Sequence, residues 1–284
     1  MQSTIVVLAN GDCITVNQVE TQYHSSRSYP RSRFIYTALE AVRLPVEVIG
    51  LQWSARLFDR LPKGDNHPVM VLPPFMAGDQ ITQRLRKQIA RWGYDVRGWD
   101  LGINAQTRNS DSMLEALDQR RLVSERLTEI VQQVATKAGR PVSLIGWSLG
   151  GIHAVEVAQA IPQQVRQIIT LGSPLGDPRA TAVYALMNAN GQQSSSDEEV
   201  DHWLKGLDQP LHEVPFTCVY SDSDGIVDPG IARISDGPQR QNIQVNSTHL
   251  GMAFNARVHY VIADRLQLDK DSWHAMDTPA WLAW

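Results

Sequence analysis

From residue 67 onward, short continuous apolar runs alternate along this chain with longer stretches of helical spacing. Runs such as Val69-Met70-Val71-Leu72 are typical of strands that helices cover on both faces. Between the runs, apolar residues recur every three or four positions, as on the buried face of a helix. Strands that alternate with helices predict a mostly parallel sheet with right-handed crossovers. The pattern therefore predicts an α/β fold, with helices flanking a central sheet, over residues 67–268.

The boundaries of the elements follow from the same pattern. The predicted strands cover residues 69–72, 94–99, 142–146, 167–171, 215–220 and 242–245. The predicted helices cover residues 79–92, 112–138, 149–160 and 251–266. The connection at 175–214 is longer than a plain crossover needs, and it reads as two short helices joined by a polar stretch at 191–199. Ser196 and Glu199 form a capping-box pattern at the start of the second helix.

Residues 1–66 predict an extension of another kind, a hairpin followed by a helix. Strand-like residues within 3–18 flank Asn10-Gly11, a strong turn signal, and the polar residues 19–33 predict a loop. Residues 34–61 predict a helix that is interrupted at Pro45. Beyond the proline, apolar residues recur every four positions, so we expect that face to be buried. These residues are Ile49, Trp53, Leu57 and Leu61.

Composition and charge narrow the function classes. The chain has 26 basic and 30 acidic residues, which argues against a nucleic-acid partner. No stretch approaches the roughly 18 apolar residues of a membrane span, and the N-terminus lacks the features of a signal peptide. Cys13 and Cys218 are not spaced as a metal site or a redox pair, although one disulfide between them stays open. We therefore expect a cytoplasmic protein without a metal or an organic cofactor.

The clearest chemical motif is Gly146-Trp147-Ser148-Leu149-Gly150, which follows an apolar strand and opens a predicted helix. G-x-S-x-G in this setting is a nucleophile elbow, a tight turn on which the serine is exposed. The two glycines are needed because side chains at these positions would collide across the turn. The Ser148 hydroxyl would then lie beside the positive end of the helix, where an oxyanion can be stabilised.

Further segments accompany the elbow in a fixed order along the chain. They are residues 69–78, 93–99, 169–174, 223–227 and 247–251. With these segments the chain resembles the bacterial esterase and lipase branch of the α/β-hydrolase superfamily, over about 200 residues. The resemblance implies the α/β-hydrolase fold and a catalytic triad in the chain order serine, acid, histidine. No motif of the family matches residues 1–66, and residues 269–284 form a tail without a recognisable pattern.

The resemblance directs the search for the base and the acid. His249 follows the last predicted strand and is the expected base, while His259 and His274 also lie downstream of the elbow. Three aspartates follow the strand that ends at Tyr220: Asp222, Asp224 and Asp228. Asp224 precedes Gly225-Ile226-Val227, which resembles the acid loop of the family, so it is the expected third member. Asp228 stays the alternative.

The oxyanion hole needs two backbone N–H donors. Leu149, directly after the nucleophile, is expected to supply one, and the loop after the first core strand should supply the other. That loop contains Pro73-Pro74 where relatives have a glycine, and proline cannot donate. The resemblance places the donor on Phe75, with Met76 as a second candidate. Met76, Trp147 and Trp203 are also candidate residues of the substrate pocket.

The favoured function is hydrolysis of a carboxylic ester with an apolar acyl group, carried by a small molecule or a lipid, through an acyl-serine. An acyltransferase or a thioesterase would use the same triad, and a non-catalytic binding protein on this fold is a third hypothesis. We also expect residues 175–214 to form a small helical lid over the nucleophile. An ordinary crossover helix packed on the sheet would show the same amphipathic spacing. The sequence does not predict the oligomeric state.

Overall fold

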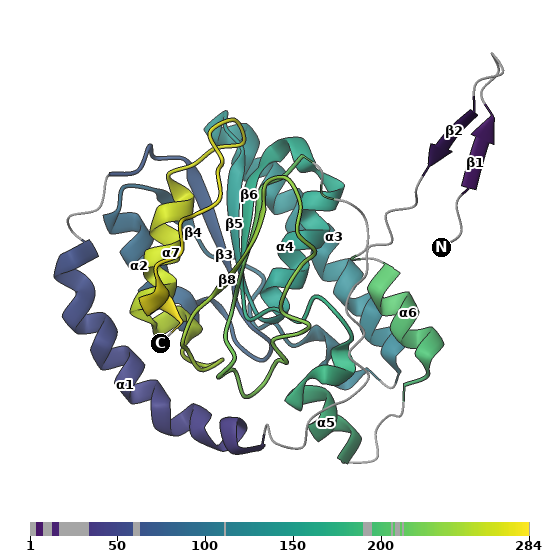
Figure 1. Cartoon of the computed structure of the whole chain (residues 1–284), viewed down its shortest axis with the longest axis horizontal. Coiled ribbons are helices and arrows are strands. Elements are labelled where there is room, and N and C mark those ends of the chain that lie inside the picture. Colours follow the sequence, from purple (N-terminus) through teal and green to yellow (C-terminus); the bar gives the residue numbers. More distant parts are fainter. Residues whose placement is uncertain are drawn as a thin grey trace.

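The computed structural model describes residues 4–7, 13–16, 34–58, 63–110, 112–189, 195–205, 207, 211 and 213–283 (Figure 1). The apolar runs form six strands that pair, all in parallel, in the order β4-β3-β5-β6-β7-β8. They are β3 Pro68–Leu72, β4 Asp95–Arg97, β5 Val142–Trp147, β6 Val165–Leu171, β7 Phe216–Tyr220 and β8 Arg240–Gln244. The expected α/β fold with a parallel central sheet is thereby confirmed.

Helices cover both faces of this sheet (Figure 1). On one face lie α3 Met113–Ala138 and α4 Leu149–Ala160, and on the other lie α2 Asp79–Arg91 and α7 Ala256–Leu266. Successive side chains of a strand point to opposite faces. Accordingly, Met70 and Leu72 belong to the core beneath α3 and α4, whereas Val69 and Val71 belong to the core beneath α2 and α7. The continuous apolar runs are thus buried on both sides, as their composition predicted.

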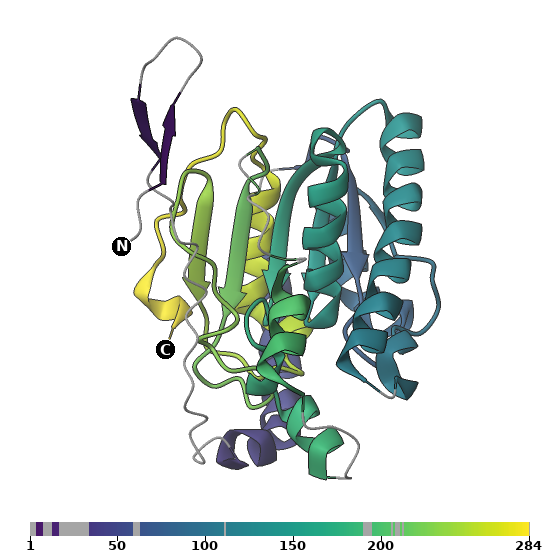
Figure 2. The ribbon, with the colours of Figure 1, turned by 90° about the vertical axis from the view of Figure 1, so that its right-hand side faces the viewer.

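The carboxyl ends of the central strands meet at one edge of the sheet. In register, Leu72 of β3 lies beside Gly146 of β5, Trp147 beside Leu171 of β6, and Leu171 beside Val219 of β7. The strand arrows in Figure 2 point toward the end of the molecule where α5 Ala182–Ala189 lies. The loops that leave this edge therefore converge, and they include the elbow and the loops that carry Asp224 and His249.

A long helix, α1 Phe34–Phe58, runs along the outside of the core beside α7 (Figure 1). The prediction that Pro45 interrupts it is wrong, because the helix continues through the proline. Pro45 is exposed, and buried residues anchor the helix on both sides of it: Glu40 before, Leu51 and Phe58 after. Tertiary packing therefore outweighs the loss of one helical hydrogen bond.

The face of α1 expected to be buried is the exposed one. Ile49 is 53% exposed and Trp53 is 83% exposed, and Val42 and Val46 lie along the same side. The side chain of Leu57, and Leu61 altogether, lie outside the described residues. The helix instead turns two glutamates toward the core, which apolar periodicity does not detect.

Before α1, β1 Thr4–Val7 and β2 Cys13–Val16 pair in antiparallel fashion, as predicted. Their turn at Asn10-Gly11 and the polar segment 19–33 lie outside the described residues. Cys218, in β7, is buried and is a free thiol, so no disulfide joins it to Cys13. No helix in the described ranges is both long and apolar enough for a membrane crossing.

The connection at 175–214 contains two helices, as expected, α5 and α6 Asp197–Lys205. The predicted capping box is present: the N–H of Ser196 donates to the Glu199 carboxylate at 2.8 Å, and the Glu199 N–H donates to the Ser196 hydroxyl at 3.2 Å. Residues 190–194, which include part of the polar stretch, lie outside the described residues. The described residues also form the short 3₁₀ helices η2 Gln106–Asn109, η3 Pro162–Gln164, η4 Pro178–Ala180, η5 Met252–Phe254 and η6 Ala280–Leu282.

The C-terminal tail, for which the sequence predicted no structure, covers the edge strand β8. Met276 exchanges hydrogen bonds with the Gln241 side chain, and the Asn246 N–H donates to the Leu282 carbonyl at 2.7 Å. Met276 and Leu282 are both buried in the core beneath α7. The tail thus shields an edge that would otherwise expose unpaired backbone groups.

Candidate active site

Ser148 lies on the sharp turn between β5 and α4, where its backbone adopts φ 52° and ψ −122°. Non-glycine residues rarely adopt a positive φ, and such strain is concentrated at functional sites. A side chain at Gly146 would overlap the backbone of Gly151, and one at Gly150 would lie 2.5 Å from the Leu72 carbonyl oxygen. The glycines of the motif are therefore required by close packing of the turn against β3 and α4.

The structure brings Asp224 and His249 together. The imidazole Nδ1 of His249 lies 2.7 Å from Oδ2 of Asp224, and both side chains are buried. The other carboxylate oxygen of Asp224 accepts the N–H groups of Ile226 and Val227, at 2.9 and 2.8 Å. These bonds fix the carboxylate, so that it in turn fixes the orientation and the tautomer of the imidazole.

The alternative acids and bases lie elsewhere. Asp222 accepts a hydrogen bond from the side chain of Gln244, and Asp228 accepts one from the N–H of Gly230 within its own turn. His259 is buried in α7 with Nε2 against the Ala253 carbonyl, and His274 contacts the Ser272 carbonyl in the tail. Of the three candidate acids, Asp224 is the one whose carboxylate hydrogen-bonds the His249 imidazole.

The histidine loop is attached to the elbow through Trp147. The indole N–H of this residue, which directly precedes Ser148, donates to the His249 carbonyl at 3.1 Å. Gly172, at the end of β6, lies against the same pair: a side chain there would meet Asp224 at 2.9 Å and the His249 ring at 3.1 Å. The elbow, the acid and the base are thus packed into one cluster at the carboxyl edge of the sheet.

Burial and neighbouring charges shift the pKa of His249 in opposite directions. Burial lowers the pKa of the imidazole, but the carboxylates of Asp224 and Glu40 and the hydrogen bond to Asp224 raise this pKa above its usual value. The protonated form is therefore stabilised inside the protein. A group of this kind can take a proton from a neighbouring hydroxyl more readily than an isolated buried histidine could.

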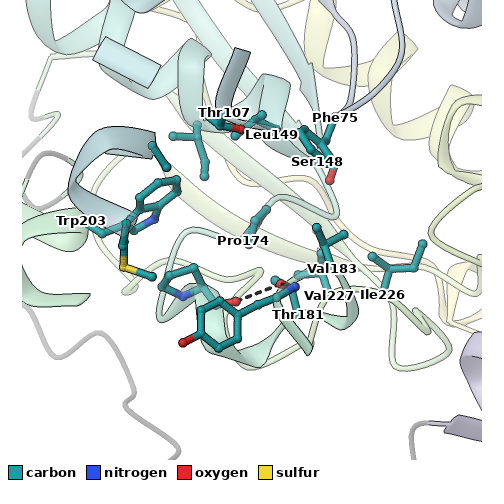
Figure 3. A pocket seen from close by; sticks show the side chains of 15 residues that line it. Phe75, Thr107, Ser148, Leu149, Pro174, Thr181, Val183, Trp203, Ile226 and Val227 are labelled. Atoms are coloured by element: carbon teal, nitrogen blue, oxygen red, sulfur yellow. Dashed lines mark hydrogen bonds between the residues drawn. The ribbon is translucent and has the colours of Figure 1, made fainter. Parts of the chain in front are cut away.

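The residues predicted to supply the oxyanion donors line one pocket together with Ser148. Leu149 is the first residue of α4, where an N–H has no carbonyl within the helix to bond. The N–H of Met76, the second candidate in the loop after β3, donates to the Asn104 carbonyl at 2.8 Å and is therefore occupied. Phe75 and Leu149 line the same pocket as Ser148 (Figure 3), which favours Phe75 as the second donor.

The comparisons with known proteins bear on the fold. A family model described as a PGAP1-like alpha/beta domain matches residues 104–242, a range that includes Ser148 and Asp224. The solved structure of the lipase BlEst2 of Bacillus licheniformis is 15% identical, with a TM-score of 0.52, and covers 74% of this chain and 95% of that one. Lipase B of Aspergillus fumigatus is 18% identical, with a TM-score of 0.53, over 75% of this chain and 54% of that one.

The chain has the α/β-hydrolase fold. The fold that the resemblance implied is thereby confirmed. A curated relative, the pimeloyl-[acyl-carrier protein] methyl ester esterase of Aliivibrio fischeri strain MJ11, is 40% identical over 52 residues. That match covers 18% of this chain and spans about a fifth, 20%, of the relative's length.

In this α/β-hydrolase fold, a pocket of about 140 Å³ opens beside Ser148 (Figure 3). Its walls are largely apolar and include the loop after β3, η2, the starts of α3 and α4, the segment 174–184 and the acid loop. Trp203 of α6 and Val183 of α5 also line it, so the connection at 175–214 supplies part of the wall. The lid itself stays a prediction.

Two of the three predicted pocket residues lie elsewhere. Trp147 is buried beneath the histidine loop, where its ring packs edge-on against Phe254 and its N–H is occupied, so it supports the site from behind. Met76 is half exposed in the loop after β3 and is absent from the lining of the described pocket. Only Trp203 lines the cavity as expected.

Sequence reasoning missed Asn104, which holds the loop after β3 that contains Phe75. Its carbonyl accepts the N–H of Met76, its own N–H donates to the Ala77 carbonyl at 2.9 Å, and its side chain donates to the Pro73 carbonyl at 2.9 Å. Asn104 is 1% exposed. A lone asparagine in an irregular stretch gives no sequence signal, because its partners lie about thirty residues earlier.

Two buried histidines outside the pair have structural surroundings. His153 in α4 contacts the Ser124 hydroxyl at 2.8 Å, and burial together with Arg120 lowers its pKa to about 3. His67, which directly precedes β3, is fully buried and contacts Asp65 and the Ser143 hydroxyl at 2.5 and 2.8 Å. Both rings are neutral over the physiological range, as their environment requires.

Proposed function

We propose that this protein hydrolyses carboxylic esters through an acyl-serine intermediate at Ser148, with His249 as base and Asp224 as its orienting acid. The observation that carries the proposal is the strained serine at the floor of an apolar pocket, beside a buried Asp224–His249 pair bonded at 2.7 Å. A pure binding protein needs an apolar pocket but not this pair. The names of the relatives, lipases and esterases, support the same reaction class.

In the first half of the proposed reaction, the Ser148 oxygen attacks the ester carbonyl carbon while its proton passes to Nε2 of His249. The carbonyl oxygen becomes an oxyanion, which the N–H groups of Leu149 and Phe75 stabilise. Collapse of this tetrahedral intermediate breaks the bond to the leaving alcohol, which takes the proton from His249. The acyl group is then attached to Ser148.

In the second half, a water molecule gives a proton to His249 and attacks the acyl carbonyl. A second tetrahedral intermediate forms in the same oxyanion hole, and its collapse returns the proton to the Ser148 oxygen. The products are one carboxylic acid and one alcohol for each ester and water consumed. Asp224 keeps its charge throughout and stabilises the imidazolium that forms twice in the cycle.

The pocket defines the proposed substrate class. A cavity of about 140 Å³ is similar to one that holds a benzene molecule, so we expect an apolar acyl group on the order of six carbon atoms. Because the walls are largely apolar, a charged acyl terminus would lose its hydration without gaining a partner. The substrate is therefore proposed to be an uncharged, short- to medium-chain acyl ester.

The test is a series of p-nitrophenyl esters of increasing acyl length, hydrolysed by the wild type and by Ser148→Ala. We expect the wild-type kcat/KM to pass through a maximum in the short to medium range, and Ser148→Ala to lose at least about a thousandfold. Activity of Ser148→Ala within about tenfold of the wild type would overturn the proposal.

The same assay separates hydrolysis from acyl transfer. Adding an alcohol acceptor in increasing amounts and measuring both free acid and new ester gives the partition of the acyl-enzyme. A hydrolase keeps releasing mainly acid at millimolar acceptor. If new ester dominates at that concentration, the acyltransferase hypothesis replaces hydrolysis.

A further inference from the structure

α1 lies outside the set of motifs that identify the fold, yet it contacts both loops that carry the proposed acid and base. Its side toward the core carries two carboxylates, Glu40 and Glu47, which are seven residues apart and therefore share one face of the helix. Glu40 is 3% exposed. A buried carboxylate is costly unless it is fully hydrogen-bonded, so its partners indicate its purpose.

The partners of Glu40 are three backbone N–H groups of the two loops. Oε1 accepts the N–H of Gly225 and the N–H of His249, each at 2.8 Å, and Oε2 accepts the N–H of Leu250 at 2.8 Å. Gly225 directly follows Asp224. One carboxylate oxygen thus joins the residue after the acid to the base itself, across 24 residues of sequence.

Two glycines show how closely α1 approaches these loops. A side chain at Gly225 would lie 2.5 Å from the backbone nitrogen of Thr37, and one at Gly251 would overlap the Glu47 carboxylate. Thr37 also donates its hydroxyl to the Gly225 carbonyl. A glycine at 225 therefore lets the backbone of α1 pack directly on the acid loop, and a glycine at 251 leaves room for the Glu47 carboxylate.

We infer that Glu40 is a positioning residue of the active site, whose carboxylate holds the Asp224 loop and the His249 loop in the relative placement that the triad requires. The inference rests on the proposed ester hydrolysis. Glu40 is absent from the pocket lining and contacts neither Ser148 nor an oxyanion donor in the described structure. It therefore acts through the loops and not on the substrate.

The physical basis is the strength of charge-assisted hydrogen bonds and their shared acceptor. N–H groups that donate to a carboxylate form bonds roughly twice as strong as neutral ones. Because Gly225 and His249 donate to the same oxygen, a shift of either loop lengthens a bond that also holds the other. Displacement of a reacting group by about 1 Å can cost on the order of a hundredfold in rate, so this coupling matters for the reaction.

Glu47 secures the loop just before the base. Its carboxylate accepts the Thr248 N–H and the Ser247 hydroxyl, each at 2.8 Å, and the side-chain amide of Asn255 at 3.0 Å. These contacts hold the histidine loop alone. Glu40 is distinct from Glu47 because it also reaches the acid loop.

Glu40 also contributes charge to the site. The charged groups that act on His249 are Asp224, from the loop after β7, and Glu40, from α1, while Glu47 contacts the two preceding residues. Both Asp224 and Glu40 raise the pKa of the imidazole. Removal of the Glu40 charge should therefore lower this pKa, whereas loss of a purely structural contact should leave it in place.

The experiment compares Glu40→Gln and Glu40→Asp with the wild type in the full chain. Glutamine keeps the shape and removes the charge, so we expect kcat to fall about 10- to 100-fold, an unchanged KM, and a pH–rate inflection at lower pH. Aspartate keeps the charge but is one methylene shorter, so we expect a reduced kcat with the inflection near the wild-type position. Glu125→Gln, the same change on the exposed face of α3, is the matched control and should match the wild type.

Titration of the His249 ring protons by NMR, assigned by comparison with His249→Gln, gives the pKa without any substrate. Wild-type kcat and an unmoved inflection in a folded Glu40→Gln would overturn the inference, provided that the wild type shows Ser148-dependent hydrolysis. If Glu40→Gln does not fold, a Glu40→Asp variant with wild-type kcat overturns it instead. If the wild type itself lacks Ser148-dependent hydrolysis, the proposed function fails, and an unmoved His249 pKa in Glu40→Gln then rejects the charge contribution separately.

Discussion

The residues of the proposed triad differ in how their positions are enforced. Ser148 is fixed by its own turn, because Gly146 and Gly150 allow close packing that other residues would prevent. Asp224 and His249 are fixed by hydrogen bonds to groups distant in sequence. The serine could therefore be predicted from a local motif, whereas the choice among the three aspartates required the fold.

The acid assignment leads to a ranking of variants. We expect Asp224→Asn to lower kcat by about 10⁴-fold, because an amide would favour the wrong imidazole tautomer. Asp222→Asn and Asp228→Asn should retain activity within a few-fold, since their carboxylates bond Gln244 and Gly230 and not His249. Steady-state kinetics on one ester decides the order. A larger loss in Asp228→Asn than in Asp224→Asn would move the third member of the triad.

The charge environment of His249 sets the pH dependence of activity. The imidazole must be neutral to accept the Ser148 proton, and its pKa is raised because the two carboxylates outweigh burial. We therefore expect kcat/KM to fall on acidification, with an inflection above the usual histidine value of about 6.5. A pH–rate profile measured from pH 4 to 9 tests this. An inflection well below 6.5, or a flat profile, would contradict the assigned environment.

The amphipathic helix α6 both packs against the core and lines the pocket. The sequence left open whether Trp203 lines a pocket or packs in the core, because amphipathic spacing fits both. In the structure its ring lies 4.0 Å from the Arg120 guanidinium, which is fully buried and paired with Glu156, and the same ring lines the pocket. Trp203 therefore belongs both to the core and to the pocket wall.

Replacement of this tryptophan should show both effects. We expect Trp203→Ala to lose roughly 3–5 kcal/mol of unfolding free energy, because a large buried side chain is removed from above a charge. The optimum acyl length should also increase, since the pocket gains volume. Trp53→Ala, on the exposed face of α1, is the control and should change stability by less than about 0.5 kcal/mol. If the dependence of kcat/KM on acyl length is unchanged in Trp203→Ala, α6 is an ordinary crossover helix and does not shape the acyl pocket.

The helix α1 shows where periodicity fails as a predictor. The rule assigns the apolar side of a helix to the core, but here Glu40 and Glu47 face the core while Trp53 and Ile49 face solvent. The hydrogen-bond partners of the two glutamates lie about 185–210 residues away along the chain. In the sequence, the spacing of seven residues between the two glutamates was the only sign of this arrangement. Glutamates spaced in this way usually lie on a solvent-exposed face of a helix.

For the whole molecule, the order of elements along the chain was sufficient to predict the parallel sheet and its helices. Strand composition determines burial on both faces, and parallel pairing brings the carboxyl ends together, so the location of the site followed from the topology. The tail was unpredictable because its contacts with Gln241 and Asn246 depend on which strand forms the edge. Strand order, and hence the edge, is a property of the folded sheet.

Three buried histidines determine how the whole protein should respond to acid. Burial lowers the pKa of His153 to about 3 and those of His67 and His259 to about 4. Between these values and about 6.5 the unfolded chain binds more protons than the native one, so the free energy of unfolding decreases as the pH falls. His249, whose pKa is raised, acts in the opposite direction, but it is one group against three.

We therefore expect the urea midpoint to fall steeply between pH 6.5 and pH 4, as the pKa values of the three histidines require. His153→Gln should reduce the slope, whereas His202→Gln, at an exposed position of α6, should leave it unchanged. A midpoint that is constant over this range would show that these imidazoles titrate normally.

Ester hydrolysis at this site depends on whether Ser148 forms a covalent acyl intermediate. The most direct measurement is peptide mapping by mass spectrometry in two experiments. In one the protein has reacted with a fluorophosphonate, and in the other its reaction with an apolar p-nitrophenyl ester has been rapidly quenched. We expect one adduct per chain, on the peptide that contains Ser148, under both conditions, and none in Ser148→Ala. Ester turnover with the adduct on another residue, or with none on Ser148, would contradict this expectation.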